Sequence, residues 1–306
     1  MARRFVAIDG GGTKTTTVAV DARGNELARH TGPTSNPAVI GFEETVRVLC
    51  EGIDGVRRAL GFADAFAGGW IGLAGVDRPG DRERLLPALT PGIASPRITN
   101  DGELVLSGLG GQAGVGLIAG TGSIAMGRNA AGERLRAGGW GHIIGDEGSG
   151  WAFGVAALKA VAAEVDGSGG PAPFTGALLA HWGLDEPRQI VTKTYAPETG
   201  KGDIAGLAHF TIQAAIDGWP PALHAVRQGA DELATQVIAV ATGLRLAGAV
   251  NLALAGGLLL NTPFYRDLVL AAIAGRRPLG TVAEVRDPAL SAAREVAAVH
   301  ESLVHP

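Results

Sequence analysis

The chain has 306 residues, of which 46% are hydrophobic and 18% are charged, and its formal net charge is −4 at pH 7. This length leaves room for about two domains, and the composition is that of a folded chain rather than a disordered one. Because the net charge is negative and no basic stripe is present, we expect no nucleic-acid partner. The single cysteine, Cys50, excludes an internal disulfide, a four-cysteine zinc site and an iron–sulfur site built from this chain alone.

We expect no targeting segment among the first residues. Two arginines precede an apolar run that meets Asp9 after only four residues, too short for the core of a signal peptide. No stretch reaches the roughly 18 apolar residues of a membrane span. We therefore expect a soluble, cytoplasmic protein with no membrane partner.

A glycine-rich hairpin follows, with the sequence FVAIDGGGTKTTTVAVD. Two β-branched runs joined by a glycine triplet predict two strands and a turn. Gly11 and Gly12 lack side chains, so backbone amides there can approach a polyphosphate, and Thr13 and Lys14 add a hydroxyl and a cation. Asp9, at the strand end, is suited to hold hydrated Mg²⁺. The alternative is a plain Asp-Gly hairpin turn that binds nothing.

This hairpin differs from two common phosphate-binding loops. The P-loop needs four residues between its first glycine and Gly-Lys-Ser/Thr, and the dinucleotide fingerprint needs a helix directly after the turn. Here a strand follows the turn. The stretch instead resembles the first phosphate motif of the superfamily that contains sugar kinases, acetate kinase, actin and the heat-shock chaperone ATPases.

Two polar residues beyond the hairpin are candidates for ligand contact. Residues 24–37 predict a turn, a short strand and a loop, where Asn36 can either face a ligand or satisfy the backbone of a turn. A helix with an apolar stripe is predicted over residues 43–60. Asp101 then follows a short strand within RITNDGELVLS. An Asp at the carboxyl end of such a strand points towards the crevice where α/β proteins bind ligands, although Asn-Asp-Gly is also a common turn.

A second glycine-rich hairpin, GVGLIAGTGSIAMGR, spans residues 114–128 and repeats the pattern of the first. The repeat predicts two similar lobes. Each lobe would then supply one phosphate-binding turn, and the two turns would clamp one nucleotide between them. In the second hairpin this turn consists of Gly120, Thr121 and Gly122.

The segment AGGWGHIIGDEGSGWAFG, residues 137–154, is unusually rich in glycine, which indicates backbone that another group approaches closely. Asp146 and Glu147 are adjacent, and on a turn or a helix start both can face one ligand. The alternative is that they stabilise a helix N-terminus. We predict no metal site at His142, because no second His or Cys lies at ligand spacing. A helix is predicted from residue 150 to 165.

The rest of the chain predicts scaffold helices and one more strand-turn-helix unit. Residues 174–218 and 222–247 are expected to be mainly helical, with a break at 197–203. The sequence VNLALAGGLLLNTPFYRDL predicts a buried strand, a Gly-Gly turn and a helix, and the turn serves either a purine ring or packing alone. The final helix, 288–303, is expected to pack on the first lobe.

Taken together, DGGGTKT, TNDG, AGTGS, GGWGHIIGDEGSG and AGGLLLN resemble, in order and rough spacing, the N-acetylglucosamine kinase family. That family shares the BadF/BadG/BcrA/BcrD-type ATPase group with the activators of benzoyl-CoA reductase. The resemblance implies an α/β, two-lobed actin-like ATPase fold of duplicated ribonuclease H-like domains with an interdomain cleft. It places residues 1–113 and 288–306 in the N-terminal lobe and residues 114–287 in the C-terminal lobe.

The resemblance also implies roles for individual residues. It assigns ATP to Asp9, Gly11, Gly12, Thr13, Lys14, Gly120, Thr121, Gly122, Gly256, Gly257 and Asn261, with Asp9 also holding Mg²⁺ through water. It assigns the sugar to Asn36, Asp101, Ser123, Gly139, Trp140, Gly141, Asp146 and Glu147. Asp101 would be the catalytic base that accepts the proton of a C6 hydroxyl.

The implied activity is ATP-dependent phosphorylation of an amino sugar, with N-acetylglucosamine as the expected substrate and a homodimer as the expected assembly. Glucosamine, N-acetylmuramic acid and glucose remain open, because Ile124 replaces a polar residue that some relatives place near the sugar. An activator-type ATPase is disfavoured, since Cys50 lies outside the glycine motifs. A sugar-sensing module without phosphate transfer is the other alternative.

Overall fold

The computed structural model describes residues 3–76 and 80–304 of the chain. The chain forms two compact units, one of residues 1–113 with 283–306 and the other of residues 114–282. We call them unit 1 and unit 2. Among the described residues, no helix combines the length and the apolar character needed to span a membrane.

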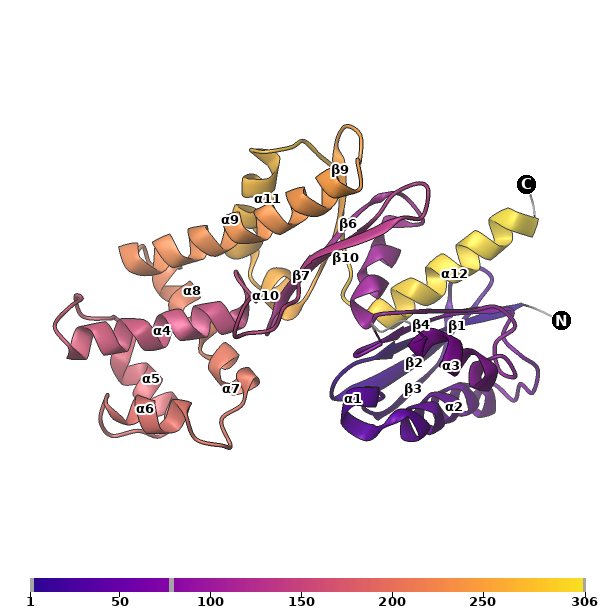
Figure 1. Ribbon diagram of the computed structural model, residues 1–306, viewed down its shortest axis with the longest axis horizontal. Helices are drawn as coiled ribbons and strands as arrows, with labels where there is room; N and C mark the ends of the chain where they lie inside the picture. Colours follow the sequence, from indigo (N-terminus) through magenta and orange to yellow (C-terminus); the bar gives the residue numbers. More distant parts are fainter. Residues whose placement is uncertain (1–2, 77–79, 305–306) are drawn as a thin grey trace. The chain divides into compact units, whose positions relative to one another are not determined.

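Unit 1 is an α/β unit built on a five-stranded sheet of order β3-β2-β1-β4-β5. β1 pairs antiparallel with β2 and parallel with β4, which in turn pairs parallel with β5. Its described elements, most of them labelled in Figure 1, are β1 (Arg4–Gly10), β2 (Lys14–Asp21), β3 (Glu26–Pro33), α1 (Pro37–Ile40), α2 (Phe42–Ala59), β4 (Gly68–Leu73), α3 (Asp81–Leu89), β5 (Pro96–Thr99), the 3₁₀ helix η1 (Asp101–Leu109) and α12 (Pro288–Val304).

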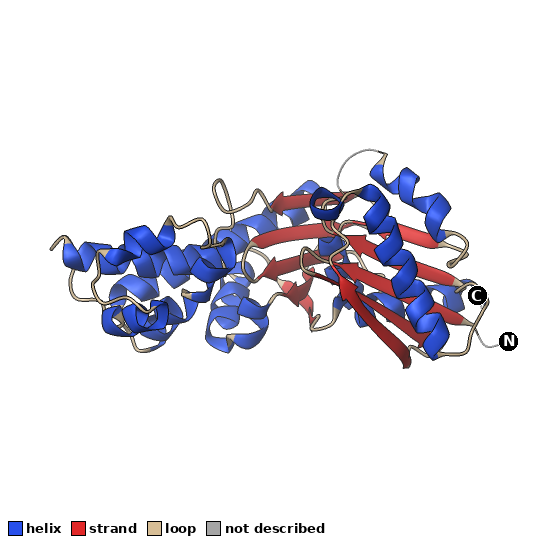
Figure 2. Cartoon of the chain, turned by 90° about the horizontal axis from the view of Figure 1, so that it is seen from below, coloured by secondary structure: helices blue, strands red, loops and turns tan. Residues whose placement is uncertain are grey.

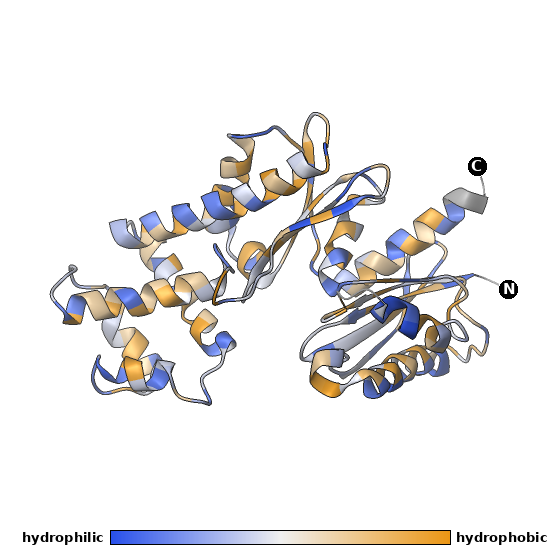
Figure 3. Cartoon of the chain, viewed as in Figure 1, coloured by the Kyte–Doolittle hydropathy of each residue, from blue (hydrophilic) through white to orange (hydrophobic). Residues whose placement is uncertain are grey.

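Both faces of this sheet are covered by helices (Figure 2). Val6 and Ile8 of β1 belong to one buried cluster with Leu49 and Ile53 of α2, so this face of the strand packs on α2. The apolar and polar stripes of α2 are visible in Figure 3. α12 packs on β1, β2 and β4, and the ring of Phe5 in β1 contacts the His300 ring of that helix. β1 is therefore buried on both sides, as its apolar run predicts.

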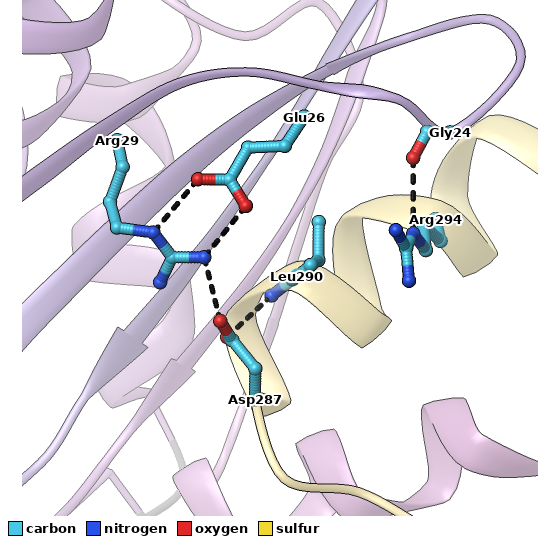
Figure 4. Close-up of polar contacts among 6 residues, drawn as sticks. All are labelled: Gly24, Glu26, Arg29, Asp287, Leu290 and Arg294. Atoms are coloured by element: carbon cyan, nitrogen blue, oxygen red, sulfur yellow. Dashed lines mark hydrogen bonds and ion pairs between the residues drawn. The ribbon is translucent and has the colours of Figure 1, made fainter.

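The C-terminal helix is tied to the β2–β3 hairpin by charged contacts (Figure 4). Arg29 of β3 pairs with Glu26 and, at 2.6 Å, with Asp287. Asp287 also accepts a hydrogen bond from the Leu290 backbone amide at 3.0 Å, which caps the start of α12. Arg294 donates to the carbonyl of Gly24 at 3.0 Å. These contacts confirm the expectation that the final helix returns to the first lobe.

Unit 2 repeats the topology of unit 1, because its sheet has the order β10-β9-β6-β7-β8. β6 pairs antiparallel with β7 and parallel with β9, as β1 does with β2 and β4. Its elements are β6 (Gly114–Ala119), β7 (Ser123–Arg128), β8 (Arg134–Gly138), α4 (Gly150–Val165), α5 (Thr175–Trp182), α6 (Gln189–Thr194), α7 (Lys201–Gly206), α8 (Ala208–Ile216), α9 (Pro220–Gly243), β9 (Val250–Ala255), α10 (Gly257–Asn261), α11 (Pro263–Ala274) and β10 (Leu279–Glu284). The duplication predicted from the two hairpins is confirmed.

A close backbone contact joins α4 to α7, and Gly154→Ala tests it. A Cβ atom at Gly154 would overlap the carbonyl oxygen of Ile204. Overpacking of this kind typically costs about 1–3 kcal/mol, so we expect a matching loss in the free energy of unfolding, measured with urea and circular dichroism.

Gly176→Ala in α5 is the matched control. No atom lies within 4 Å of a Cβ placed there, and helix propensity favours alanine by up to about 1 kcal/mol. Equal stability changes in the two variants would contradict the contact.

Candidate functional site

The turn between β1 and β2 is open. The Gly11 amide donates to the Lys14 carbonyl at 3.0 Å, and the Gly11 carbonyl accepts from the Thr34 hydroxyl at 2.9 Å. Gly12, Thr13 and Lys14 are exposed, and no atom lies within 4 Å of a Cβ built on Gly12. The turn therefore has a fixed backbone and free space above it, which suits an approaching phosphate chain.

Asp9 and Asp101 lie at the same edge of the unit 1 sheet. Asp9 pairs in register with Gly72 of β4, which pairs with Thr99 of β5, and Asp101 follows two residues later. The carboxyl ends of these parallel strands meet there. Gly72 lets η1 lie close over β4, because a Cβ at that position would be 2.5 Å from Leu104. Asp101 opens η1 and accepts a hydrogen bond from the Gly102 amide at 2.9 Å.

The environment of Asp9 makes its ionised form costly. Burial raises the pKa of Asp9 to about 6, and the nearby charges of Asp101 and Asp287 add to the rise, while Lys14 opposes it. A carboxyl group that shares its site with other carboxylates holds its proton more tightly until a cation arrives. The carboxylates at this edge of the sheet therefore favour the binding of a cation.

Asn36 is placed as the cap of α1. Its side-chain oxygen accepts a hydrogen bond from the Ala38 amide at 2.9 Å. Asn36 therefore satisfies a backbone amide, which is one of the two roles that the sequence predicted for it. Its carboxamide nitrogen donates to none of the described residues and remains available to a ligand. A Cβ at Gly75 would be 2.5 Å from the Asn36 oxygen, which explains the glycine there.

In unit 2, the β6–β7 turn is held by the start of α4. The Gly150 and Trp151 amides donate to the carbonyls of Gly120 and Thr121 at 2.8 and 3.2 Å. The Gly120 amide donates across the turn to Gly122 at 2.9 Å. This turn is thus more rigidly fixed than a free hairpin.

The two glycine turns of unit 2 lie together. A Cβ on Gly120 would be 3.6 Å from the Gly257 amide nitrogen and 3.8 Å from the Gly256 Cα. Gly256 has φ of 91°, where other residues are strained, and a Cβ there would overlap the Ala119 carbonyl. Asn261 is exposed at the end of α10, and its side-chain nitrogen would be 3.6 Å from a Cβ on Gly257. The predicted second phosphate turn and the predicted adenosine turn are therefore neighbours.

Asp146 is the most constrained residue of the glycine-rich segment. Its φ is 63°, a left-handed conformation that non-glycine residues rarely adopt, and only 3% of its surface is exposed. One carboxylate oxygen accepts from the Ser123 amide at 3.1 Å, and its backbone carbonyl accepts from the Ser149 hydroxyl at 2.5 Å. Backbone strain at a buried polar residue is a feature of functional sites.

The Gly139–Gly141 segment presents an aromatic side chain. Gly139 and Gly141 have φ of 69° and 80°, and the Gly139 amide donates to the Ser123 carbonyl at 3.0 Å. Trp140 between them is 65% exposed. Ser123 therefore connects this segment with Asp146 and with Glu147, whose carbonyl accepts from the Ser123 hydroxyl at 2.6 Å.

The structure does not bring the side chains of Asp146 and Glu147 to one place. Asp146 is buried beside Gly122, whereas Glu147 is exposed and lines a hollow of about 320 Å³ against α4 and α9. Sequence reasoning also missed Lys201, whose ammonium lies 2.6 Å from an Asp146 carboxylate oxygen. Nothing local in the sequence could have shown this pair, because Lys201 lies in a segment predicted as a break between helices.

The chain is similar to the proteins of one ATPase family and to two proteins named as kinases. The model of the "BadF/BadG/BcrA/BcrD ATPase family" matches residues 6–293. An N-acetyl-D-glucosamine kinase from Dictyostelium discoideum is 37% identical over 64% of this chain and 65% of its own length. An N-acetylmuramic acid/N-acetylglucosamine kinase from Clostridium acetobutylicum is 33% identical over 86% of this chain and 87% of its own length.

The fold is also found among solved structures. A candidate N-acetylglucosamine kinase from Chromobacterium violaceum superposes with a TM-score of 0.72 at 26% identity, covering 97% of this chain and 99% of that one. The predicted fold class, an α/β protein with two duplicated units, is confirmed.

Proposed function

Because the chain belongs to the BadF/BadG/BcrA/BcrD ATPase family, we propose that it is an ATP-dependent kinase that phosphorylates an amino sugar. N-acetylglucosamine, attacked through its C6 hydroxyl, is the proposed substrate, since both curated relatives are named for it. We further propose a homodimer, on the family resemblance.

One observation carries the proposal: a carboxylate, Asp101, lies at the same sheet edge as Asp9 and the open β1–β2 turn. A base beside a phosphate-binding turn is what transfer to a hydroxyl requires. Asp101 would accept the proton of the sugar hydroxyl as the oxygen attacks phosphorus, a role worth about 10²- to 10⁴-fold in rate. A protein that only senses sugar has no need of such a base.

The donor set of unit 1 fits Mg²⁺. Asp9 is a carboxylate whose ionised form is disfavoured by burial and by the charges of Asp101 and Asp287, and a divalent cation would offset that cost. Mg²⁺ is usually bound through one or two carboxylates, with water and phosphate oxygens as further ligands. We therefore propose that Asp9 holds Mg²⁺ of Mg-ATP through water. When bound, the ion would offset negative charge on the phosphates.

Both units would contribute residues that contact the nucleotide and the sugar. In unit 1, the backbone around Gly11 and Gly12, with Thr13 and Lys14, would hold phosphates, and Asn36 would contact the sugar. In unit 2, the Gly120–Gly122 turn would hold phosphates and the Gly256–Gly257 turn would leave space for adenosine. Asp146 and the Gly139–Gly141 segment would orient the sugar, and Trp140 would form part of the wall of the sugar pocket. A sugar contact of Glu147 stays a prediction.

An activator-type ATPase is less well supported. Such a protein needs cysteine thiolates to hold a metal cluster, and Cys50 is the single cysteine. It lies on α2, half-buried, where its sulfur contacts the Ala88 carbonyl at 3.8 Å. Burial raises the pKa of its thiol, which opposes a role as thiolate ligand.

Release of ADP from Mg-ATP with a panel of sugars tests the proposal. The panel contains N-acetylglucosamine, glucosamine, N-acetylmuramic acid and glucose, with a no-sugar control. We expect release that depends on an amino sugar and is fastest with N-acetylglucosamine. ADP release that is equal with and without every sugar would favour the activator-type ATPase, and no release would favour the sensor.

A further inference from the structure

Lys201 occupies an unusual position in unit 2. It is the first residue of α7, and its ammonium lies 2.6 Å from the buried Oδ2 of Asp146. The other oxygen of Asp146 accepts from the Ser123 amide. The Asp146 side chain is only 4% exposed, and Lys201 places a positive charge beside this buried carboxylate.

The ion pair lies directly on the β6–β7 turn. A Cβ built on Gly122 would be 2.6 Å from one Asp146 oxygen and 2.7 Å from the Lys201 ammonium. Only glycine fits at position 122, because two charged groups occupy the space that a side chain would need. The ammonium therefore lies beside the β6–β7 turn.

Lys201 has hydrogen-bond donors to spare. An ammonium carries three N–H groups, and Asp146 is its one charged partner within the described residues. Its side chain is 31% exposed and borders a hollow of about 500 Å³ in unit 2. The lining residues of this hollow include Lys159 and His142 but no carboxylate, so nothing there competes with an incoming anion for the ammonium.

We propose that Lys201 is a phosphate-binding residue: it donates to a phosphate oxygen of ATP at the β6–β7 turn while it remains paired with Asp146. The inference rests on the proposed function and deepens it. Asp146 holds the ammonium beside the turn, and the ammonium in turn compensates the buried Asp146. One cation thus serves both the phosphate turn and the carboxylate assigned to the sugar.

Nucleotide affinity, measured by calorimetry without sugar, tests this inference on the whole protein. Lys201→Gln keeps an amide donor for Asp146 but removes the charge. We expect its affinity for Mg-ATP to fall roughly tenfold or more, because a lost charged hydrogen bond has about that effect, while its affinity for adenosine, which carries no phosphate, stays unchanged. A merely structural role would weaken the binding of both ligands, and that result, or an unchanged ATP affinity, would overturn the inference.

Two further variants complete the test. Lys159→Met removes another lysine of the same hollow, which is exposed on α4, and should leave the affinity for ATP unchanged. Lys201→Arg retains the charge and should bind ATP within a few-fold of wild type; a loss equal to that of Lys201→Gln would contradict a charge-based contact. These binding measurements use no sugar. They would therefore still test the role of Lys201 if the protein phosphorylated none of the sugars in the panel.

Discussion

Asp101→Asn is expected to lower kcat for sugar phosphorylation by about 10²- to 10⁴-fold while the affinity for the sugar stays within a few-fold of wild type. Asparagine cannot accept the proton of the attacking hydroxyl, but its side-chain oxygen can still accept the hydrogen bond from Gly102 that Asp101 accepts now. The start of η1 is therefore preserved. Steady-state kinetics and sugar binding by calorimetry measure the two quantities separately.

Glu103→Gln is the matched control, because Glu103 is the next carboxylate in the same 3₁₀ helix and pairs with Arg82 at 3.5 Å. We expect it to retain kcat within a few-fold. Turnover that survives in Asp101→Asn would show that Asp101 is not the base, and a wild-type protein that binds sugar without turnover would favour the sensor.

Asp9→Asn is expected to stabilise the protein at neutral pH and to impair its activity. The pKa of Asp9 is about 6 in the folded protein, against the ordinary value of 3.8 for an Asp side chain. Below pH 3.8 the group is protonated in both states and costs nothing. As the pH rises through 6, the folded state must hold a buried charge, and wild type loses stability relative to the variant. At pH 8 the difference should approach about 3 kcal/mol.

Urea unfolding of wild type and Asp9→Asn without Mg²⁺ measures this difference as a function of pH. The advantage of the variant should shrink to less than about 1 kcal/mol at pH 4. Asp21→Asn is the control of opposite sign, because hydrogen bonds from Asn25 lower the pKa of Asp21, so its removal should not stabilise the protein. A variant at Asp9 that is less stable than wild type at pH 8 would contradict the assigned electrostatics.

The activity of Asp9→Asn completes the argument. If Asp9 holds Mg²⁺, turnover with Mg-ATP should fall about a hundredfold or more despite the gain in stability. A residue kept at a cost in stability is understandable only if it serves a function. Full activity in the variant would instead make Asp9 a packing residue with a perturbed pKa.

The local patterns of the sequence predicted the parts of the fold that depend on local interactions. The two glycine hairpins, the helix at Gly150–Val165 and the final helix are confirmed, because their periodicity and turn residues lie within short windows. β8 and β10 were missed. Both are exposed edge strands, so they lack the apolar alternation by which a half-buried strand is recognised. α1 has only four residues and was not predicted, because so short an element carries no helical periodicity.

The candidate site was predictable to the same extent. The proximity of Asp9 and Asp101 follows from strand ends, and that of Gly120 and Gly256 from duplicated turns. The separation of Asp146 from Glu147 depends on the left-handed backbone of Asp146, which residue type does not indicate. The pairing of Asp146 with Lys201 depends on how α7 packs on α4, and such tertiary contacts leave no periodic signal in the sequence.

The most direct test of the kinase assignment is the identity of the product. The protein would be incubated with Mg-ATP and N-acetylglucosamine, and the products analysed by ³¹P and ¹H nuclear magnetic resonance. We predict a phosphomonoester whose phosphorus couples to the two protons on C6, formed in equal amount to ADP. Inorganic phosphate beside unmodified sugar would contradict the account, because it would show that water rather than the sugar accepts the phosphoryl group.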